Sequence, residues 1–234
     1  GSKKVLFYDN NWLAKEKKFL YNDIAKLHRL VDEKRISSID FNQGLDCRLM
    51  TEEIADRLQG LPISPVRFAF DGIQEDGFFQ KAVKMMVDRN FHSFTNYILY
   101  NFKDSPQDFY YRLRETALLN ECCNGAIVRG FPMRYQPINS AKEERDFVGK
   151  KWTQREVANV IKIMGAHSGP AGTFSPGTMI EFKYWFGASE LEFLSILNYP
   201  KLGKFLKKKT AYLRLNPGIR GQRDANTIEN KRRD

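Results

Sequence analysis

The sequence predicts an α/β fold built on a parallel sheet, because short apolar runs alternate with helical patterns five times before residue 140. Each apolar run ends in polar residues, and a helix between two parallel strands makes a right-handed crossover. No Gly-x-Gly-x-x-Gly motif and no phosphate loop follows any run. These observations indicate a parallel sheet or an incomplete (β/α) barrel rather than a dinucleotide-binding fold. The strands are expected at 4–8, 36–41, 66–70, 94–100 and within 124–135.

The intervening segments carry apolar residues at steps of three and four, which is the spacing of a helix with one buried face. Thr51 can cap the second helix, and Ser105 followed by Pro106 is a typical helix start. Gly60 ends the second helix. The helices are expected at 15–33, 52–59, 78–88 and 106–120.

The alternation stops near residue 138, and we therefore divide the chain into three parts. Residues 3–140 form the core, 141–200 a helical extension and 201–234 a basic tail. Thr153 and Glu156 make a capping box for a helix through Met164, and further helices are expected at 180–186 and 189–197. The intervening 165–177 is a glycine-rich loop. His167 in that loop is a candidate for catalysis or anion binding, although most loop histidines do neither.

The composition predicts a globular cytoplasmic protein with no membrane contact. The chain is 42% hydrophobic, has no apolar run of membrane-spanning length and begins without a signal-peptide pattern. The leading Gly-Ser resembles an expression remnant, so the natural sequence is expected to begin upstream. Three cysteines, Cys47, Cys122 and Cys123, make neither a disulfide framework nor a zinc or iron–sulfur spacing.

The formal net charge of +10 is concentrated at the carboxyl end, where 201–234 holds eleven Lys/Arg and three Asp/Glu. A basic segment of this kind can hold nucleic acid through phosphate contacts. The alternative is a solvated, in part disordered terminus that only aids solubility.

Polar residues gather where the expected strands end, although strand interiors usually disfavour Asn and Asp. Because the carboxyl ends of parallel strands meet at one edge, this arrangement predicts a ligand site. The alternative is a network of ion pairs and amides that only stabilises the rim of the sheet. The residues in question are Asp9, Asn10, Asn42, Gln43, Asp46, Arg48, Asp71 and Asn101.

Four of these strand-end segments resemble, in order and spacing, those of radical S-adenosylmethionine (SAM) enzymes. They are 7–11 (Phe-Tyr-Asp-Asn-Asn), 41–49 (Phe-Asn-Gln-Gly-Leu-Asp-Cys-Arg-Leu), 67–71 (Arg-Phe-Ala-Phe-Asp) and 97–106 (Tyr-Ile-Leu-Tyr-Asn-Phe-Lys-Asp-Ser-Pro). The likeness covers roughly residues 4–200 and is greatest to uncharacterised members related to the cobalamin-binding branch. It implies a partial (β/α) barrel, a partial TIM barrel, that holds SAM across the carboxyl ends of its strands.

The resemblance also implies roles for the strand-end residues. Asp9 and Asn10 stand where the family has a Gly-Gly-Glu-like motif that holds the SAM amino group. Asn42, Gln43 and Arg48 stand where the family meets the SAM carboxylate or the substrate. Asp71 lies near the ribose position, and Asn101 near the adenine position. A zwitterionic amino acid does need an acceptor for its ammonium and a guanidinium for its carboxylate.

The chain departs from this family at its defining motif. The Cys-x-x-x-Cys-x-x-Cys segment that holds a 4Fe–4S cluster is absent, and in the family it follows the first strand. The resemblance therefore predicts a truncated fragment without that strand and cluster loop, with the cluster present in the full-length parent only. A natural loss of the cluster is the alternative.

Two functions are carried forward. The first is a fragment of a radical SAM enzyme with an unknown substrate, in which the use of cobalamin stays open. The second is a catalytically dead barrel that binds nucleic acid or a partner through the Lys/Arg-rich 201–233. The exposed edge left by a missing strand could also pair with a second chain and make an oligomer.

Overall fold

In the computed structural model the described residues are 3–123, 125–137, 146–168 and 176–216. Their core is an α/β arrangement of five parallel strands in sequence order. The strands are β1 (Lys4–Phe7), β2 (Ser38–Phe41), β3 (Val66–Ala69), β4 (Ser93–Tyr100) and β5 (Ile127–Arg134).

These strands form two sheets rather than one. β1 pairs with β2, and β4 lies between β3 and β5. Two isolated parallel bridges, Ile39 to Ile63 and Leu45 to Phe68, connect the sheets across the β2–β3 gap. The strands of the described residues make no closed barrel.

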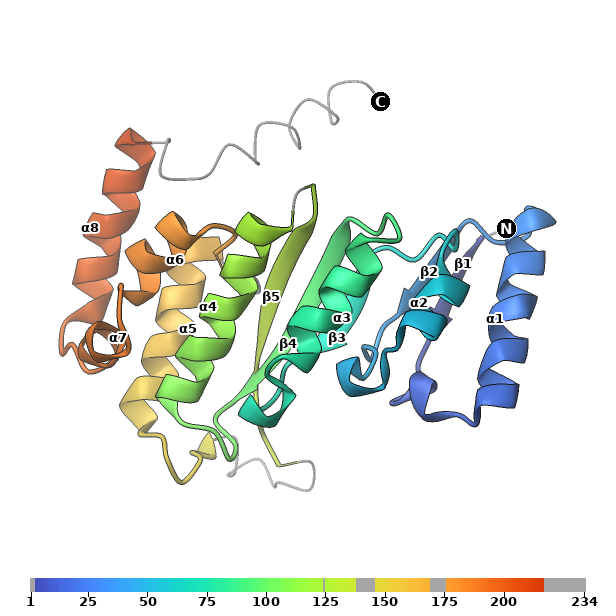
Figure 1. Cartoon of the computed structure of the whole chain (residues 1–234). Coiled ribbons are helices and arrows are strands. Elements are labelled where there is room, and N and C mark those ends of the chain that lie inside the picture. Colours follow the sequence, from blue (N-terminus) through green and yellow to red (C-terminus); the bar gives the residue numbers. More distant parts are fainter. Residues whose placement is uncertain (1–2, 124, 138–145, 169–175, 217–234) are drawn as a thin grey trace.

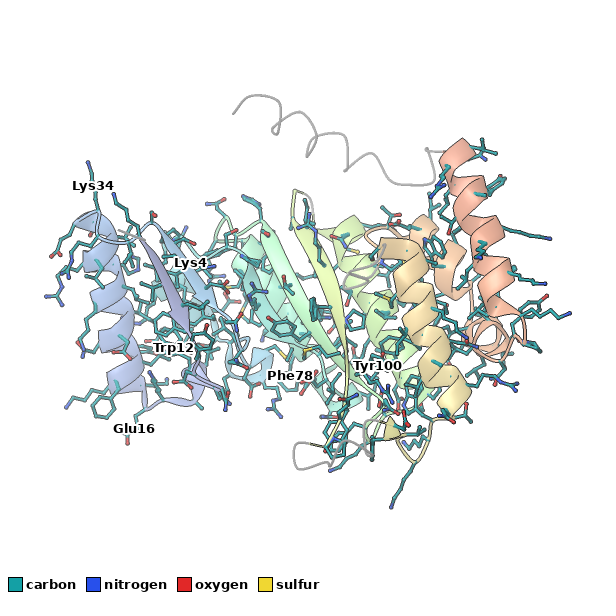
Figure 2. The ribbon with its side chains drawn as sticks, turned by 180° about the vertical axis from the view of Figure 1, so that it is seen from behind. Lys4, Trp12, Glu16, Lys34, Phe78 and Tyr100 are labelled. Atoms are coloured by element: carbon teal, nitrogen blue, oxygen red, sulfur yellow. The ribbon has the colours of Figure 1, made fainter. Side chains whose placement is uncertain are left out.

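The first four helices cover one face of the strands (Figure 1). Every crossover advances to the next strand in the same direction, and right-handed connections then place all the helices on the same side. The opposite face is seen in Figure 2, with these helices behind the strands. The helices are α1 (Lys17–Asp32), α2 (Glu52–Leu58), α3 (Phe78–Val87) and α4 (Pro106–Cys122).

The predicted helix caps are confirmed. The Thr51 Oγ1 accepts the Ile54 N–H at 3.3 Å. Ser105 and Asp108 bond reciprocally at the start of α4, with Pro106 in its first turn. Such caps depend on local sequence alone, because they satisfy N–H groups that have no partner within the helix.

Strand β5 is longer than the sequence suggests, since it passes through Gly130 and Pro132 as far as Arg134. Pro132 lies opposite Ile98 of β4. Among the described strands β5 pairs only with β4, and a proline is tolerated where the missing N–H would face away from the ladder. The position at the edge therefore explains why the proline does not end the strand.

Beyond β5 the chain is helical. α5 (Gln154–Ser168) carries the predicted Thr153–Glu156 capping box but continues through Gly165 to Ser168, four residues past the expected end. The rest of the predicted glycine-rich loop, 169–175, lies outside the described residues. The two helices that follow are α6 (Met179–Phe186) and α7 (Glu190–Leu197).

The basic segment differs from the expected tail, because its first part forms helix α8 (Leu202–Leu215). Leu202, Leu206 and Leu213 are at most 4% exposed, so α8 packs as an amphipathic helix against the preceding ones. The helix was not predicted from the sequence, because the lysines between these leucines make the segment strongly basic. Residues 217–234 lie outside the described residues.

Two hydrophobic clusters make the core, and β4 belongs to both. Phe94 at the start of β4 packs with the cluster under α1–α3. Ile98 and Tyr100, further along β4, pack with α4 and the carboxyl-terminal helices. The helical extension is therefore joined to the sheet through β4 and α4.

Candidate functional site

A polar cavity of about 220 Å³ lies at the carboxyl ends of β1, β2 and β3. Trp12, Phe78 and Tyr100, which end or follow strands, mark this edge in the lower half of Figure 2, whereas Lys4 at the start of β1 lies higher. The cavity is lined by Asn10, Asn11, Gln43, Gly44, Leu45, Asp46, Arg48, Ala69, Asp71 and Glu75. Five of the predicted residues therefore lie together here: Asn10, Gln43, Asp46, Arg48 and Asp71.

The β1 end contributes amides rather than a carboxylate. Asn11 donates its Nδ2–H to Asp46 at 3.3 Å, while its buried Oδ1 has no hydrogen-bond partner among the described residues. Asp9 is exposed, accepts the Asn11 N–H and lies 3.6 Å from the Lys15 ammonium. Asp9 therefore shapes the loop but does not line the cavity, and Asn11 is the residue that the sequence analysis missed.

The β2 end contributes a guanidinium held in place by a carboxylate. Arg48 donates Nε–H and Nη2–H to the two oxygens of Asp46, at 2.8 and 2.7 Å. This hydrogen bonding to Arg48 lowers the pKa of Asp46 below its usual range. The Arg48 side chain is 49% exposed and its Nη1 makes no hydrogen bond to another described residue, so the guanidinium can still receive an anion. An ion pair at the rim of the sheet and a ligand site are therefore compatible, because Arg48 can take part in both.

Gly44 lets this loop pass close to the sheet. It has a φ of +85°, a conformation that favours glycine, and a Cβ at this position would lie 3.3 Å from the Tyr97 ring. Asn42 contributes its backbone, since its carbonyl accepts the Tyr97 hydroxyl at 2.9 Å. Asn42 does not line the cavity.

The β3 end contributes two buried carboxylates. The Asp71 Oδ1 accepts the Leu99 N–H of β4 at 2.9 Å, and the Glu75 Oε2 accepts the Asp71 N–H at 2.6 Å. Burial raises the pKa of both Asp71 and Glu75. Glu75, which was not predicted as a site residue, lies in a short 3₁₀ turn, Ile73–Glu75. The signal in the sequence that could have identified it is its position four residues after Asp71.

Arg112 of α4 positions this end of the sheet. Its fully buried guanidinium donates to the carbonyls of Phe70, Asp71 and Leu99 at 2.7–3.1 Å and to Asp104 at 2.7 Å. One side chain thereby fixes the end of β3 against that of β4 and determines where Asp71 stands.

Asn101 is not brought to the cavity. It is fully buried at the end of β4 with a φ of +67°, which Asn tolerates better than most residues. Its amide accepts the Gly149 N–H at 2.8 Å and donates to the Phe147 carbonyl at 3.0 Å. Asn101 thus anchors the chain segment before α5, and an adenine contact stays a prediction from the resemblance.

A second polar group, not predicted, lies on the sheet face opposite the helices. Arg67 of β3 binds both oxygens of Asp40 at 2.7 and 3.1 Å and donates to the Tyr97 hydroxyl at 3.2 Å. Lys4 reaches the same Asp40 at 3.2 Å. Ile39, Phe68 and their neighbours face the helices, so alternation along the strands places Asp40 and Arg67 on the other side.

The described residues do not fit an iron–sulfur cluster. Cys47 is buried and donates to the Ala69 carbonyl, and burial raises the pKa of its thiol to about 12, whereas a metal ligand must be a thiolate. Cys122 and Cys123 are neighbours at the other end of α4, and no group of three His, Cys, Asp or Glu suited to a metal occurs in the described part of the chain.

The cavity does fit the amino-acid part of SAM. The buried Asn11 Oδ1 is an acceptor that lacks a donor, and Asp71 and Glu75 add acceptors for an ammonium. Arg48 supplies donors for a carboxylate.

His167 makes a separate arrangement at the end of α5. Its Nε2 lies 3.0 Å from the Glu181 Oε1, and its Nδ1 lies 2.6 Å from the Ser168 hydroxyl. It also packs edge-on against Trp185. These contacts join α5 to α6, and His167 does not line the carboxyl-end cavity.

Comparison with known proteins identifies no relative: no family model, no curated protein and no solved structure matches this chain. Across the described residues no helix is both long and apolar enough to cross a membrane.

Proposed function

We propose that this chain is part of a radical SAM enzyme and that it binds SAM at the carboxyl-end cavity. The observation that carries the proposal is the position of Arg48 beside the acceptors Asn11, Asp71 and Glu75 at the ends of three parallel strands. The ammonium of the ligand would be held by the acceptors and its carboxylate by the Arg48 Nη1 group. The open sheet would then be the partial barrel of this family.

The size of the cavity limits what it holds. Its 220 Å³ is less than the roughly 300–1,000 Å³ of typical small-molecule sites, so it suits the methionine part of SAM rather than the whole molecule. The nucleoside would continue over the open face of the sheet, toward Arg67 and Tyr97. The cluster that reduces SAM in this family would come from residues other than these 234, and the substrate is left open.

The first test is SAM binding to Arg48→Ala. We expect the wild-type chain to bind SAM, measured by isothermal titration calorimetry, and the variant to bind on the order of tenfold more weakly, since a charge-assisted hydrogen bond contributes about 1.5–3 kcal/mol. The melting temperature should change little, because the Arg48 side chain is half exposed.

Arg57→Ala is the matched control, because Arg57 is 45% exposed and also paired with a nearby carboxylate, on α2. It should bind SAM as the wild type does. Failure of the wild type to bind SAM, or equal binding by Arg48→Ala, would contradict the proposal.

The second candidate, a catalytically dead barrel that binds nucleic acid or a partner, is favoured by α8. From Lys201 to Asn216 there are six Lys/Arg and no Asp or Glu. Salt separates the two functions, because phosphate-dominated binding falls steeply as salt rises. The affinity for SAM at a compact cavity should change little with salt concentration.

A further inference from the structure

A groove of about 440 Å³ lies between α5 and α8, on the carboxyl-terminal helices rather than at the sheet. Its floor is apolar, and small residues from both helices leave the space open: Ala166 on α5, Gly203 and Ala211 on α8. The full lining is Lys162, Ala166, Gly203, Leu206, Lys207, Thr210, Ala211 and Arg214. None of these residues belongs to the carboxyl-end cavity.

The rim of the groove is cationic without a compensating charge. Lys162, Lys207 and Arg214 are all exposed, and no carboxylate lines the groove. None of the three takes part in a salt bridge within the described part of the chain. Lys162 donates only to the neutral amide of Asn159, at 2.9 Å. These charges are therefore available to a polyanion.

The apolar side of α8 argues against a membrane surface as that polyanion. A helix that lies in a membrane interface inserts its apolar face. In α8 the leucines of that face, Leu202, Leu206 and Leu213, are buried against the protein. Tyr212 and Leu215, in its last turn, are the large apolar side chains that α8 exposes, and the rest of its solvent-facing side is mainly charged.

A hollow bordered by cations suits a single strand better than a duplex. In a single strand the bases are free to enter an apolar recess while the phosphates meet the lysines and arginine on the rim. In a duplex the bases are paired and stacked, so the hollow would stay unused. The volume is within the range of sites that take one small-molecule group.

We propose that the α5–α8 groove binds single-stranded nucleic acid, with phosphates at Lys162, Lys207 and Arg214 and one base in the hollow over Leu206. This inference does not depend on SAM binding, because the two sites share no residue.

The test is fluorescence anisotropy of the full chain with a labelled oligouridine of about 12 nucleotides, a length within known site sizes. In Lys162→Gln/Lys207→Gln/Arg214→Gln we expect affinity at low salt to fall on the order of tenfold. The slope of log K against log salt should fall by about 2, as for three phosphate contacts on a single strand.

The matched control is Lys18→Gln/Lys81→Gln/Lys151→Gln, which removes the same charge from exposed residues elsewhere. Both triple variants keep 217–234 unchanged, so nonspecific attraction by that segment is the same in each. The affinity of the control variant for the oligouridine should fall less than about twofold. Equal losses in the two variants, or no binding by the wild type at low salt, would overturn the proposal.

Ala211→Leu tests the hollow without a change in charge. Leucine is also a good helix former, so α8 should keep its structure, which circular dichroism can check. We expect oligouridine affinity to fall at least about fivefold, the lower end of one base contact, while inorganic polyphosphate binds as before. Unchanged oligouridine binding, or a preference for duplex or for phosphatidylserine vesicles over the single strand, would reject a single-strand site.

Discussion

Asp40 is a buried carboxylate on the face of the strands opposite α1–α4, and it pairs with two cationic side chains. Its side chain is 4% exposed and pairs with Arg67, which is 19% exposed, and with Lys4. Hydrogen bonding to Arg67 lowers the pKa of Asp40. A lowered pKa means that the folded chain holds the charged form more strongly than the unfolded chain does. The pair therefore contributes stability above the ordinary aspartate pKa, and the contribution is lost as the pH falls through the folded value.

We predict that Asp40→Asn lowers the free energy of unfolding by roughly 2 kcal/mol at neutral pH, because Arg67 is left partly buried without a carboxylate. The difference from wild type should shrink as the pH falls below about 4, the ordinary aspartate pKa, because the unfolded wild-type chain then takes up a proton that the folded chain does not. It should be lost once the pH is below the lowered pKa of the folded state. Urea unfolding at both pH values measures it.

Asp23→Asn is the control for this prediction. Asp23 also pairs with two lysines, Lys15 and Lys26, but all three side chains are at least 33% exposed. Its loss should cost under about 0.5 kcal/mol. Similar costs for the two variants would show that burial does not determine the strength of the Asp40 pair.

Helix α8 was not predicted from the sequence, because its basic composition is typical of a solvated tail. Its lysines made 201–216 look like part of a tail, yet three leucines at helical spacing bury against α5–α7. Tyr184 of α6 adds a contact, since its hydroxyl donates to the Lys209 carbonyl at 2.8 Å. Lys209 itself lies 4.8 Å from the Tyr184 ring centre, and burial lowers its pKa.

We predict that Leu213→Ala costs roughly 2–4 kcal/mol in chemical unfolding, as for other buried leucines. Leu213 is 2% exposed. Leu215→Ala is a control two residues away on the same helix, and at 81% exposure it should cost under about 0.5 kcal/mol. If both substitutions were silent, α8 would not be part of the folded core.

At the scale of the whole molecule, five parallel strands follow one another in sequence order with α1–α4 on one face, which leaves the other face uncovered by these four helices (Figure 2). Parallel strands with helical crossovers are shared by many α/β folds, so this arrangement leaves the radical SAM assignment a proposal. The described residues hold no group of three His, Cys, Asp or Glu suited to a metal.

Anaerobic reconstitution with iron and sulfide tests whether the protein carries out the reductive cleavage of SAM that the proposed family performs. We predict that this chain takes up no stoichiometric iron, whereas a chain extended upstream of Gly1 takes up about four irons and cleaves SAM under reduction. Iron content and visible absorption measure the uptake. Absence of iron in both chains would favour the catalytically dead barrel, in which case the α5–α8 groove becomes the main functional surface.

Local chemistry explains what could be predicted from the sequence alone. The Thr51, Ser105 and Thr153 caps involve residues three apart, and the strand and helix periodicities involve neighbours in one element. The same local patterns show where each strand ends. They therefore predicted that polar residues at these ends lie along one edge of the sheet, among them Asn10, Gln43, Arg48 and Asp71. The parallel α/β class follows from these local signals.

Only tertiary structure decided which strand-end residues share a cavity and which do not. Asn101 turns to the chain before α5, whereas Asn11 lies at the cavity beside Asp46, a partner 35 residues further along the chain. Pro132 stays within a strand because, among the strands that the structure describes, β5 pairs with β4 alone. The α5–α8 groove likewise depends on two helices whose nearest ends, Ser168 and Leu202, are 34 positions apart in the sequence. Such outcomes rest on contacts between segments far apart in the chain, which no local pattern encodes, whereas caps and periodicities depend on residues a few positions apart.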